Sequence, residues 1–351
     1  MTDKRETVGG WGRRAFIKSA LAVGAGAALR PGTAGAAESP AKLPVPPGAA
    51  FAGMAGAYSA MYTPFFRDGA KAGQLNEGMI ERLVEYAVKT GLTGMYLTGS
   101  TGEGFLLSLD ERKRVYARAA KAARGRLKLI AHVGCLNTDD ACELARHAAK
   151  VGIDWVSSVA PVYFGQNFDA AYDHYKTISE ATDLPFMVYA VLGKLVPDQA
   201  ARFFDLRNVR GMKYTGRDYY DLGVMRRKLN KPAIFFAGAD EQVLNGFATG
   251  DFSGCIGTTD NQIPDQFVKI CEHVVANDFK GAAVYQENVC KFIDKLFAVP
   301  GFGKNTMRYI GLDCGDHRVP VAKPITEEQY AAVEKAADEL GFIRRNDALN
   351  I

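Results

Sequence analysis

The chain has 351 residues, of which 48% are hydrophobic and 23% are charged, proportions that are ordinary for a globular protein. This length allows one large domain or two small ones. Residues 1–37 hold six Lys/Arg and two Asp/Glu, so they account for the whole formal net charge of +4. Because the rest of the chain is near neutral, we expect neither a nucleic acid nor an anionic membrane as a partner.

The N-terminal segment has the pattern of an export signal. Arg13 and Arg14 precede an aromatic and an aliphatic residue, an apolar stretch covers 19–29, and small residues follow at 34–37. This pattern resembles a twin-arginine signal; a short membrane anchor or a disordered basic tail is the alternative. The apolar stretch is shorter than the roughly 20 residues that span a bilayer. We therefore predict that 1–37 is a cleaved signal peptide and that the protein is exported to the periplasm, free of the membrane.

The cysteines are expected to be free, buried thiols. Export would permit disulfides, but the twin-arginine route carries proteins that have folded in the cytoplasm, and cysteine is often a small buried hydrophobe. No Cys-x-x-Cys or Cys/His cluster has metal-ligand spacing, and the five histidines suggest no metal site either. The six cysteines are Cys135, Cys142, Cys255, Cys271, Cys290 and Cys314.

After a Pro-rich linker at 38–50, apolar runs typical of strands alternate with helical patterns. Helix starts are indicated at Asn76, Ser108, Thr138 and Pro197, and helix ends at Gly91 and Gly152. The strands are expected to begin near Met54, Gly94, Leu127, Trp155, Pro185, Val209, Ala233 and Ser253.

Eight such alternations predict a closed (β/α)8 TIM barrel over 51–276. An open doubly wound sheet is the competing architecture, but it normally carries a Gly-rich dinucleotide fingerprint after the first strand, which Gly53-Met54-Ala55-Gly56 does not supply. Amphipathic spacing at 264–276, 281–298 and 327–340 predicts further helices. We expect 277–351 to form a C-terminal helical extension packed on the barrel.

Lys213 lies near the end of the apolar run 209–215. An amine at the inner end of a buried strand is poorly solvated, which favours its neutral, nucleophilic form. The segment 99–104, Gly-Ser-Thr-Gly-Glu-Gly, follows another apolar run and offers hydroxyls and backbone N–H groups as a cradle for a small carboxylate. An amine beside a carboxylate cradle indicates chemistry on a 2-keto acid.

Other polar residues follow the predicted strands, and a TIM barrel places its active site at that rim. Each has an ordinary explanation: a tyrosine can be a rim residue, an acidic pair can cap a helix, hydroxyls can form turns, and the lysine can reach solvent. Their gathering at one rim favours a site. The candidates are Ser100, Thr101, Tyr163, Tyr189, Lys213, Thr215, Gly238, Asp240, Glu241 and Thr258.

From about Met54 to about Gly341 the chain resembles the dihydrodipicolinate synthase/N-acetylneuraminate lyase family of Schiff-base enzymes. The motif 99–104, Tyr189 and Gly211-Met212-Lys213 match its three central motifs in order and spacing. The resemblance implies a TIM barrel, a homotetramer, and no metal or organic cofactor.

The resemblance also implies a role for each site residue. Lys213 would form an imine with pyruvate or a longer 2-keto acid, and Ser100 and Thr101 would hold the carboxylate. Tyr189 would move the proton. Tyr163 would join a hydroxyl relay with Thr101 and could reach a neighbouring subunit's site.

Two segments resemble the lyase branch. The acidic pair in Gly238-Ala239-Asp240-Glu241-Gln242 matches residues that hold a sugar's hydroxyls, and Thr258 keeps the hydroxyl of the lyase Gly-Ser-Thr. After Tyr189 the usual Asn-x-Pro is absent. Lys194 stands where the synthases have an arginine for a second carboxylate, so it could bind an acidic substrate tail or face solvent.

These observations predict a pyruvate-dependent aldolase that reversibly cleaves a sugar-derived 2-keto acid similar to N-acetylneuraminate. The first alternative is a synthase-like condensation of pyruvate with aspartate semialdehyde, or a related 2-keto acid hydro-lyase. The second is an exported keto-acid binding protein without turnover. The aldehyde partner and the physiological direction remain open at this point.

Overall fold

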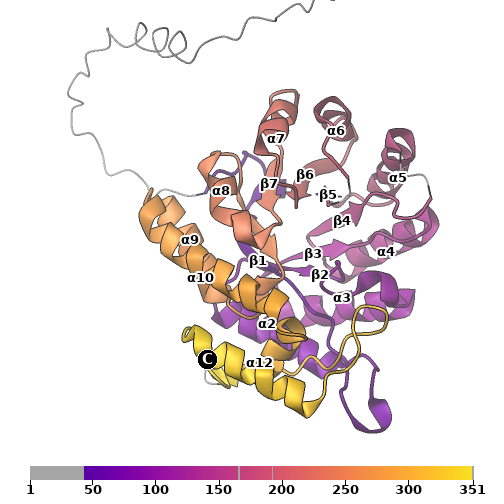
Figure 1. Ribbon diagram of the computed structural model, residues 1–351. Coiled ribbons are helices and arrows are strands. Elements are labelled where there is room, and N and C mark those ends of the chain that lie inside the picture. The colour runs from indigo at the N-terminus through magenta and orange to yellow at the C-terminus, as the bar shows by residue number, and fades with distance from the viewer. Residues whose placement is uncertain (1–42, 165–166, 192, 350–351) are drawn as a thin grey trace, which may run out of the picture. The chain divides into compact units, whose positions relative to one another are not determined.

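The computed structural model describes residues 43–164, 167–191 and 193–349. Eight parallel strands pair in chain order and close into a barrel, β1 beside β8, as Figure 1 shows. The predicted TIM barrel is therefore confirmed. The strands are β1 (Gly56–Ala60), β2 (Gly94–Leu97), β3 (Lys128–His132), β4 (Trp155–Val159), β5 (Phe186–Ala190), β6 (Val209–Tyr214), β7 (Ile234–Ala237) and β8 (Gly254–Gly257).

Helices follow the strands and cover the outside of the barrel. Asn76 and Ser108 cap two of them with their side chains, as predicted, whereas Thr138 is the first helical residue and Asn137 is the cap. Pro197 opens α6 and Gly152 ends α4 at a φ of 86°. The barrel helices are α2 (Glu77–Lys89), α3 (Leu109–Ala123), α4 (Thr138–Val151), α5 (Phe168–Glu180), α6 (Pro197–Phe203), α7 (Tyr219–Arg226), α8 (Val243–Ala248) and α9 (Pro264–Val275).

Side chains alternate between the inside and the outside of the barrel, as the pleat of a strand requires. In β6, Met212 and Tyr214 point outward and join the large core between strands and helices. Lys213 therefore points inward. The barrel interior is filled by a second apolar cluster, which includes Tyr58, Tyr96, Ile130, Trp155, Met187, Tyr189, Ile234, Phe236 and Ile256.

The second half of the predicted linker 38–50 is not a free linker. Leu43 is buried, and the carbonyl of Pro44 accepts a hydrogen bond from the Ser253 hydroxyl. The carbonyl of Ala50 accepts one from the Trp155 indole at 3.2 Å. Residues 43–50 thus cover the end of the barrel where the strands begin; 1–42, including the predicted signal, lie outside the described residues.

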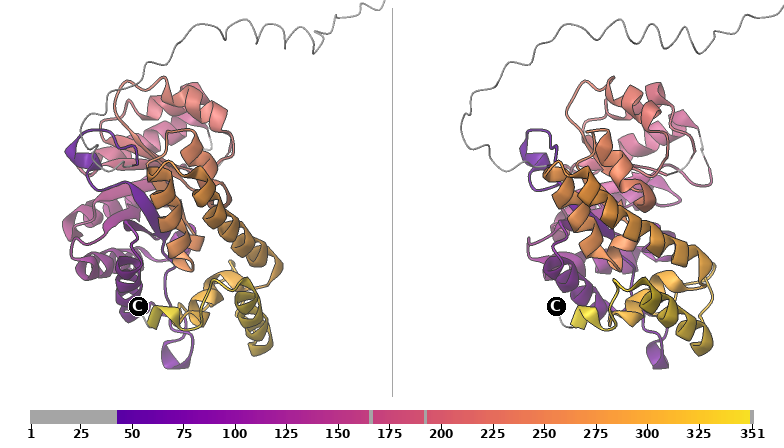
Figure 2. Two further views of the ribbon diagram at one scale, coloured as in Figure 1. Left: turned by 90° about the vertical axis from the view of Figure 1, so that its left-hand side faces the viewer. Right: turned by 60° about the vertical axis from the view of Figure 1, so that its left-hand side comes forward.

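Three helices continue after the barrel: α10 (Phe279–Ala298), α11 (Phe302–Tyr309) and α12 (Glu327–Leu340). Figure 2 shows these orange and yellow helices beside the violet N-terminal barrel segments. The sequence predicted α10, two residues short, and α12, but missed α11. It was missed because it is only eight residues long and several of its buried residues are polar, Lys304 and Thr306 among them.

The cysteines are all free, and four of the six are buried. Within the described ranges, no group of three or more His, Cys, Asp or Glu residues is placed to hold a metal ion. None of the helices in those ranges combines the length and the apolar character needed to cross a membrane.

Candidate active site

Lys213 and Tyr189 form the centre of the site. They are register partners on the adjacent strands β6 and β5, and both point into the barrel. The Lys213 side chain is buried, with Nζ 4.2 Å from the centroid of the Tyr189 ring and 5.0 Å from that of Tyr96. The amine is thus held against two aromatic faces, away from bulk water, at the predicted rim.

The electrostatic setting of Tyr189 suits proton transfer. Burial alone would raise the pKa of its hydroxyl, but the positive charge of Lys213 and hydrogen bonds from Ser100 and Lys213 outweigh burial, so the pKa lies below its usual value of 10.0. A phenol with a lowered pKa yields its phenolate more readily and can then accept a proton. The structure thus joins Lys213, Tyr189 and Ser100 as the sequence predicted.

Gly238 and Thr215 border the amine. A Cβ atom on Gly238 would lie 2.2 Å from the Thr215 hydroxyl oxygen and 3.0 Å from Cε of Lys213, so any side chain there would displace the lysine. The Thr215 hydroxyl oxygen is buried and has no well-formed hydrogen bond within the described part of the chain. It also contributes to the lowered pKa of Tyr189, so it faces the same reacting groups.

The predicted cradle is a tight loop after β2. Thr98 and Glu103 bracket it, both with left-handed backbones, at φ 52° and 56°. Ser100 is exposed at its tip, and the Thr101 hydroxyl lies 2.6 Å from that of Thr258. Thr101 and Thr258, 157 positions apart, therefore meet on one side of the barrel mouth.

The two residues of the acidic pair differ in exposure, and their predicted role in holding a sugar's hydroxyls stays a prediction. The Asp240 side chain is buried, and its Oδ2 accepts hydrogen bonds from the backbone N–H and hydroxyl of Thr259 at 2.8 and 2.7 Å. Burial raises its pKa, while the Thr259 bonds and Lys213 lower it in part. Glu241 is half-exposed and pairs with Arg217 at 3.3 Å. Glu241 thus lies nearer solvent, whereas Asp240 braces the loop after β8.

Tyr163 is not near Thr101 in the single chain. Its side chain is 74% exposed on the loop after β4 and packs edge-on against Phe164. The Thr101 hydroxyl is bonded to Thr258 instead. A relay from Tyr163 therefore stays a prediction that needs a neighbouring subunit.

Lys194 lies at the surface, where it pairs weakly with Asp221 at 3.7 Å and its side chain is 78% exposed. It borders a cavity of about 850 Å³ that lies outside β5 and β6, under α5 and α6. Tyr189 and Thr215 line the inner end of this cavity. The space is therefore adjacent to the reacting groups, although most of its lining comes from the outer layer of the barrel.

Sequence reasoning missed His132, at the end of β3. Its Nε2 accepts a hydrogen bond from the Val159 N–H at 3.3 Å, so Nδ1 carries the proton and donates to the Thr98 carbonyl at 3.2 Å. Burial, with the charge of Arg112, lowers its pKa well below 6.5. This neutral ring packs edge-on against Tyr189. Its position at a strand end was the signal that could have identified it.

Asp260, also missed, lies beside Asp240 next to Gly257. A Cβ on Gly257 would lie 1.9 Å from Oδ1 of Asp240 and 2.5 Å from Oδ2 of Asp260, and neither oxygen has a hydrogen-bond partner in the described chain. Burial, followed by the charge of Asp240, raises the pKa of Asp260 well above its usual value. Two neighbouring buried carboxyls disfavour being charged at the same time.

Comparison with known proteins identifies the family. The sequence model of the dihydrodipicolinate synthetase family matches residues 53–340. The chain belongs to this family. An N-acetylneuraminate lyase of Rhizobium meliloti (strain 1021) is 35% identical over 290 residues, which cover 81% of this chain and 94% of that protein. The family predicted from the three motifs is therefore confirmed.

Solved structures of dihydrodipicolinate synthetase family members have the same fold. The N-acetylneuraminate lyase of Mycoplasma synoviae is 30% identical, with a TM-score of 0.75 over 82% of this chain and 99% of its own. A catalytic lysine mutant of the Ruminococcus gnavus sialic acid aldolase is 27% identical, with a TM-score of 0.75 over 82% of this chain and 97% of its own. Both relatives are named for lyase or aldolase activity.

Proposed function

We propose that this protein is a carbon–carbon lyase of the lysine-dependent aldolase type, cleaving a sugar-derived 2-keto acid to pyruvate and an aldehyde. The observation that carries the proposal is the buried Lys213 amine, whose Nζ lies 4.2 Å from the centroid of the Tyr189 ring. An amine nucleophile, a proton carrier and a carboxylate cradle are the groups that this reaction requires.

The reaction follows from these positions. The neutral Lys213 amine attacks the C2 carbonyl of the substrate. The Tyr189 hydroxyl then gives its proton to the departing hydroxide, so that water leaves, a protonated imine forms and Tyr189 becomes a phenolate. The Tyr189 phenolate takes the proton of the C4 hydroxyl, the C3–C4 electron pair moves toward the imine, and the aldehyde leaves. The resulting enamine takes a proton at C3, which Tyr189 can return, and hydrolysis of the imine releases pyruvate and restores Lys213.

The lyase branch is favoured because relatives at 35% and 32% identity are named N-acetylneuraminate lyases. Glu241, half-exposed beside the site, can accept hydrogen bonds from a sugar's hydroxyls, and Lys194 can meet an acidic tail. Condensation of pyruvate with aspartate semialdehyde is the second candidate, since the family carries the synthetase name. A binding protein without turnover would have no use for the amine beside a proton carrier.

The test is a screen of purified protein, lacking residues 1–37, against sugar-derived 2-keto acids, with released pyruvate as the readout. Cleavage of N-acetylneuraminate or another sugar acid is the expected result. Activity only with pyruvate and aspartate semialdehyde would move the protein to the synthase reaction. Borohydride in the presence of pyruvate should leave a permanent adduct on Lys213, and an unmodified lysine would favour the binding protein.

We further propose that residues 1–37 direct export to the periplasm, on the sequence pattern alone. Replacing Arg13 and Arg14 by Lys should retain the precursor in the cytoplasm, whereas the native chain should appear, shortened, in the periplasmic fraction. Equal processing of both would contradict the proposal.

We also propose a homotetramer, which would give the exposed Tyr163 a partner subunit to reach. Sedimentation velocity of the purified protein should show four chains. A monomer with full activity would contradict both the tetramer and a role for Tyr163 in a neighbour's site.

A further inference from the structure

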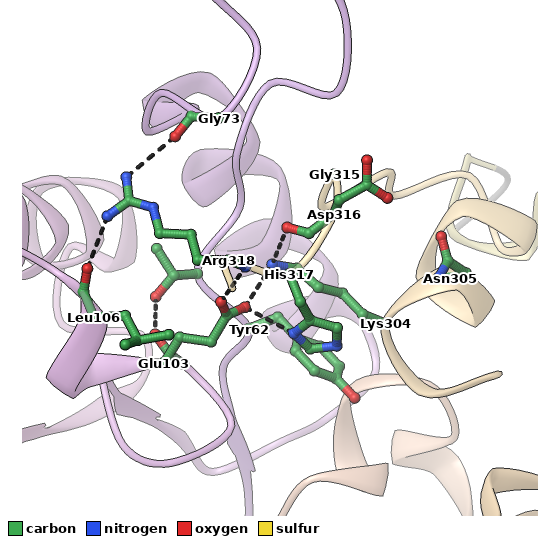
Figure 3. A network of polar contacts seen from close by, with 12 residues as sticks. Tyr62, Gly73, Glu103, Leu106, Lys304, Asn305, Gly315, Asp316, His317 and Arg318 are labelled. Atoms are coloured by element: carbon green, nitrogen blue, oxygen red, sulfur yellow. Dashed lines mark hydrogen bonds and ion pairs between the residues drawn. The ribbon is translucent and has the colours of Figure 1, made fainter. Parts of the chain in front are cut away.

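The acidic residue of the cradle loop, Glu103, is held by the C-terminal extension. Its carboxylate is buried and accepts three hydrogen bonds: from Lys304 Nζ at 2.9 Å, His317 Nδ1 at 2.9 Å and the Arg318 backbone N–H at 2.7 Å. Figure 3 shows these donors converging on the carboxylate. All three lie more than 200 positions away along the chain.

The Glu103–Lys304 pair is fully buried, with side-chain exposures of 1% and 0%. Although burial opposes ionisation, His317 and Lys304 lower the pKa of Glu103 to about 2, so the carboxylate stays charged. Lys304 is held in turn by the Asp316 carbonyl at 3.1 Å and lies 4.5 Å from the centroid of the Phe65 ring. Removing one member of such a pair would leave an uncompensated buried charge.

Arg318 ties the same stretch to the rest of the cradle. Its guanidinium forms a two-pronged ion pair with Glu111, which lies in the first turn of α3. It also donates to the carbonyls of Leu106 at 3.0 Å and Gly73 at 3.1 Å. The extension therefore holds both the loop and the start of the helix that follows it.

The loop needs such support because its backbone is strained. Thr98 and Glu103 both adopt the left-handed region, which costs free energy for residues with a Cβ, and for β-branched Thr98 above all. The Thr98 end is held inside the barrel, where its hydroxyl donates to the His132 carbonyl at 3.0 Å. At the Glu103 end, the Gly102 carbonyl accepts a hydrogen bond from the Thr63 hydroxyl at 2.6 Å, and the Glu103 carboxylate is held from the extension.

We propose that Lys304, His317 and Arg318 are positioning residues that hold Ser100 and Thr101 in the geometry that binds the substrate's carboxylate. Lys304 and His317 act through Glu103, and the Arg318 side chain acts through Glu111 and Leu106. The inference rests on the proposed function and adds a task for the extension. None of the three touches the reacting groups in this structure. The extension then serves the chemistry and not only the stability of the barrel.

The experiment compares two ketones that differ in the carboxylate. Pyruvate and hydroxyacetone are each trapped on Lys213 with borohydride, and the ketone concentration for half-maximal adduct is measured by mass spectrometry. In Lys304→Met the value for pyruvate should rise about tenfold or more, because a small misplacement of a binding group has a large effect. The value for hydroxyacetone, which has no carboxylate to hold, should stay within about twofold of the native protein.

Lys295→Met is the matched control, because Lys295 pairs with Glu339 at 2.6 Å inside the same extension and does not contact the loop. It should leave both ketones unchanged. If Lys304→Met does not fold by circular dichroism, Arg318→Gln serves instead, since it keeps the buried pair and removes the contacts to Glu111 and Leu106. Its effect on pyruvate should be smaller, about threefold, and again confined to pyruvate.

The outcomes separate the two proposals. A native protein that forms no adduct with pyruvate would overturn the proposed function and this inference together. A native adduct with unchanged pyruvate values in a folded Lys304→Met or Arg318→Gln would overturn only the inference. Equal losses for both ketones would also overturn it, because they would indicate a general structural role.

Discussion

The two sides of the barrel mouth differ in how firmly they are built. On the side of β2 and β8, the Thr101–Thr258 contact and the Asp240–Thr259 bonds cross between loops, and Glu103 is held by three donors. On the side of β4–β6, Tyr163 and Lys194 are exposed and a cavity of about 850 Å³ opens beside Tyr189. In Figure 1 the C-terminal helices lie away from α5, α6 and α7, which border the open side.

This difference assigns different tasks to the two sides. A carboxylate and a ketone are common to all 2-keto acids, so the groups that hold them benefit from rigidity. The remainder of the substrate varies, and its recognition suits exposed loops. We call the side of β2 and β8 the braced side and the side of β4–β6 the open side. Variants on the braced side should lower activity toward every substrate, whereas variants on the open side should lower it toward only some.

The largest effect should follow from Lys213→Met. Loss of the nucleophile should abolish the borohydride adduct and lower cleavage at least ~10³-fold for every substrate. The Tyr189 pKa should also rise, because burial would no longer be offset by the lysine's charge. Mass spectrometry measures the adduct. The pKa of Tyr189 is measured from the rise of tyrosinate absorbance with pH, taken as a difference from the Tyr189→Phe variant. A remaining adduct on another lysine would place the nucleophile elsewhere.

Tyr189→Phe should separate imine formation from cleavage. The adduct with pyruvate should form normally, since Lys213 is intact, while turnover should fall ~10²–10⁴-fold because the proton carrier is lost. Single-turnover kinetics distinguish the two steps. Tyr175→Phe, a buried tyrosine of the outer layer, is the control and should keep its turnover. Unchanged turnover in Tyr189→Phe would remove the residue from the mechanism.

Acid should weaken the braced side through Glu103. Its pKa is about 2 in the folded chain against 4.5 ordinarily, so its stabilising contribution is complete above pH 4.5 and is lost as the pH falls toward 2. The shift corresponds to ~3 kcal/mol. The free energy of unfolding is measured with urea at pH 5 and at pH 3. It should fall less between these pH values in the double variant Glu103→Gln and Lys304→Met than in the native protein. Parallel losses would exclude Glu103 as a source of acid sensitivity.

The smallest effect should come from the open side. Lys194→Ala should raise KM by about fivefold or less, and only for substrates with an acidic tail, because the lysine is exposed and weakly paired. Lys228→Ala, at another exposed ion pair, is the control. Steady-state kinetics test this with two sugar-derived 2-keto acids, one with an acidic tail and one with a neutral tail. Equal effects on both KM values would show that Lys194 faces only solvent.

Some features of the barrel mouth could be predicted from the sequence and others could not. The alternation of strands and helices, Lys213, Tyr189 and the cradle were all visible, because each depends on a local pattern. The burial of Asp240 and the separation of Tyr163 from Thr101 were not, because a residue type at a strand end does not say which way its side chain turns. His132 and Asp260 were overlooked among ordinary strand-end and loop residues.

The sequence by itself determined the barrel, the family and the strand positions of Lys213 and Tyr189, since periodicity and short motifs carry that information. Only the tertiary structure decided what braces the cradle. Lys304 is a charged residue in a short helix, and it meets Glu103 across 201 positions. Such a pair exists only after the chain has folded, because burial and distant neighbours, not adjacent residues, bring the two charges together.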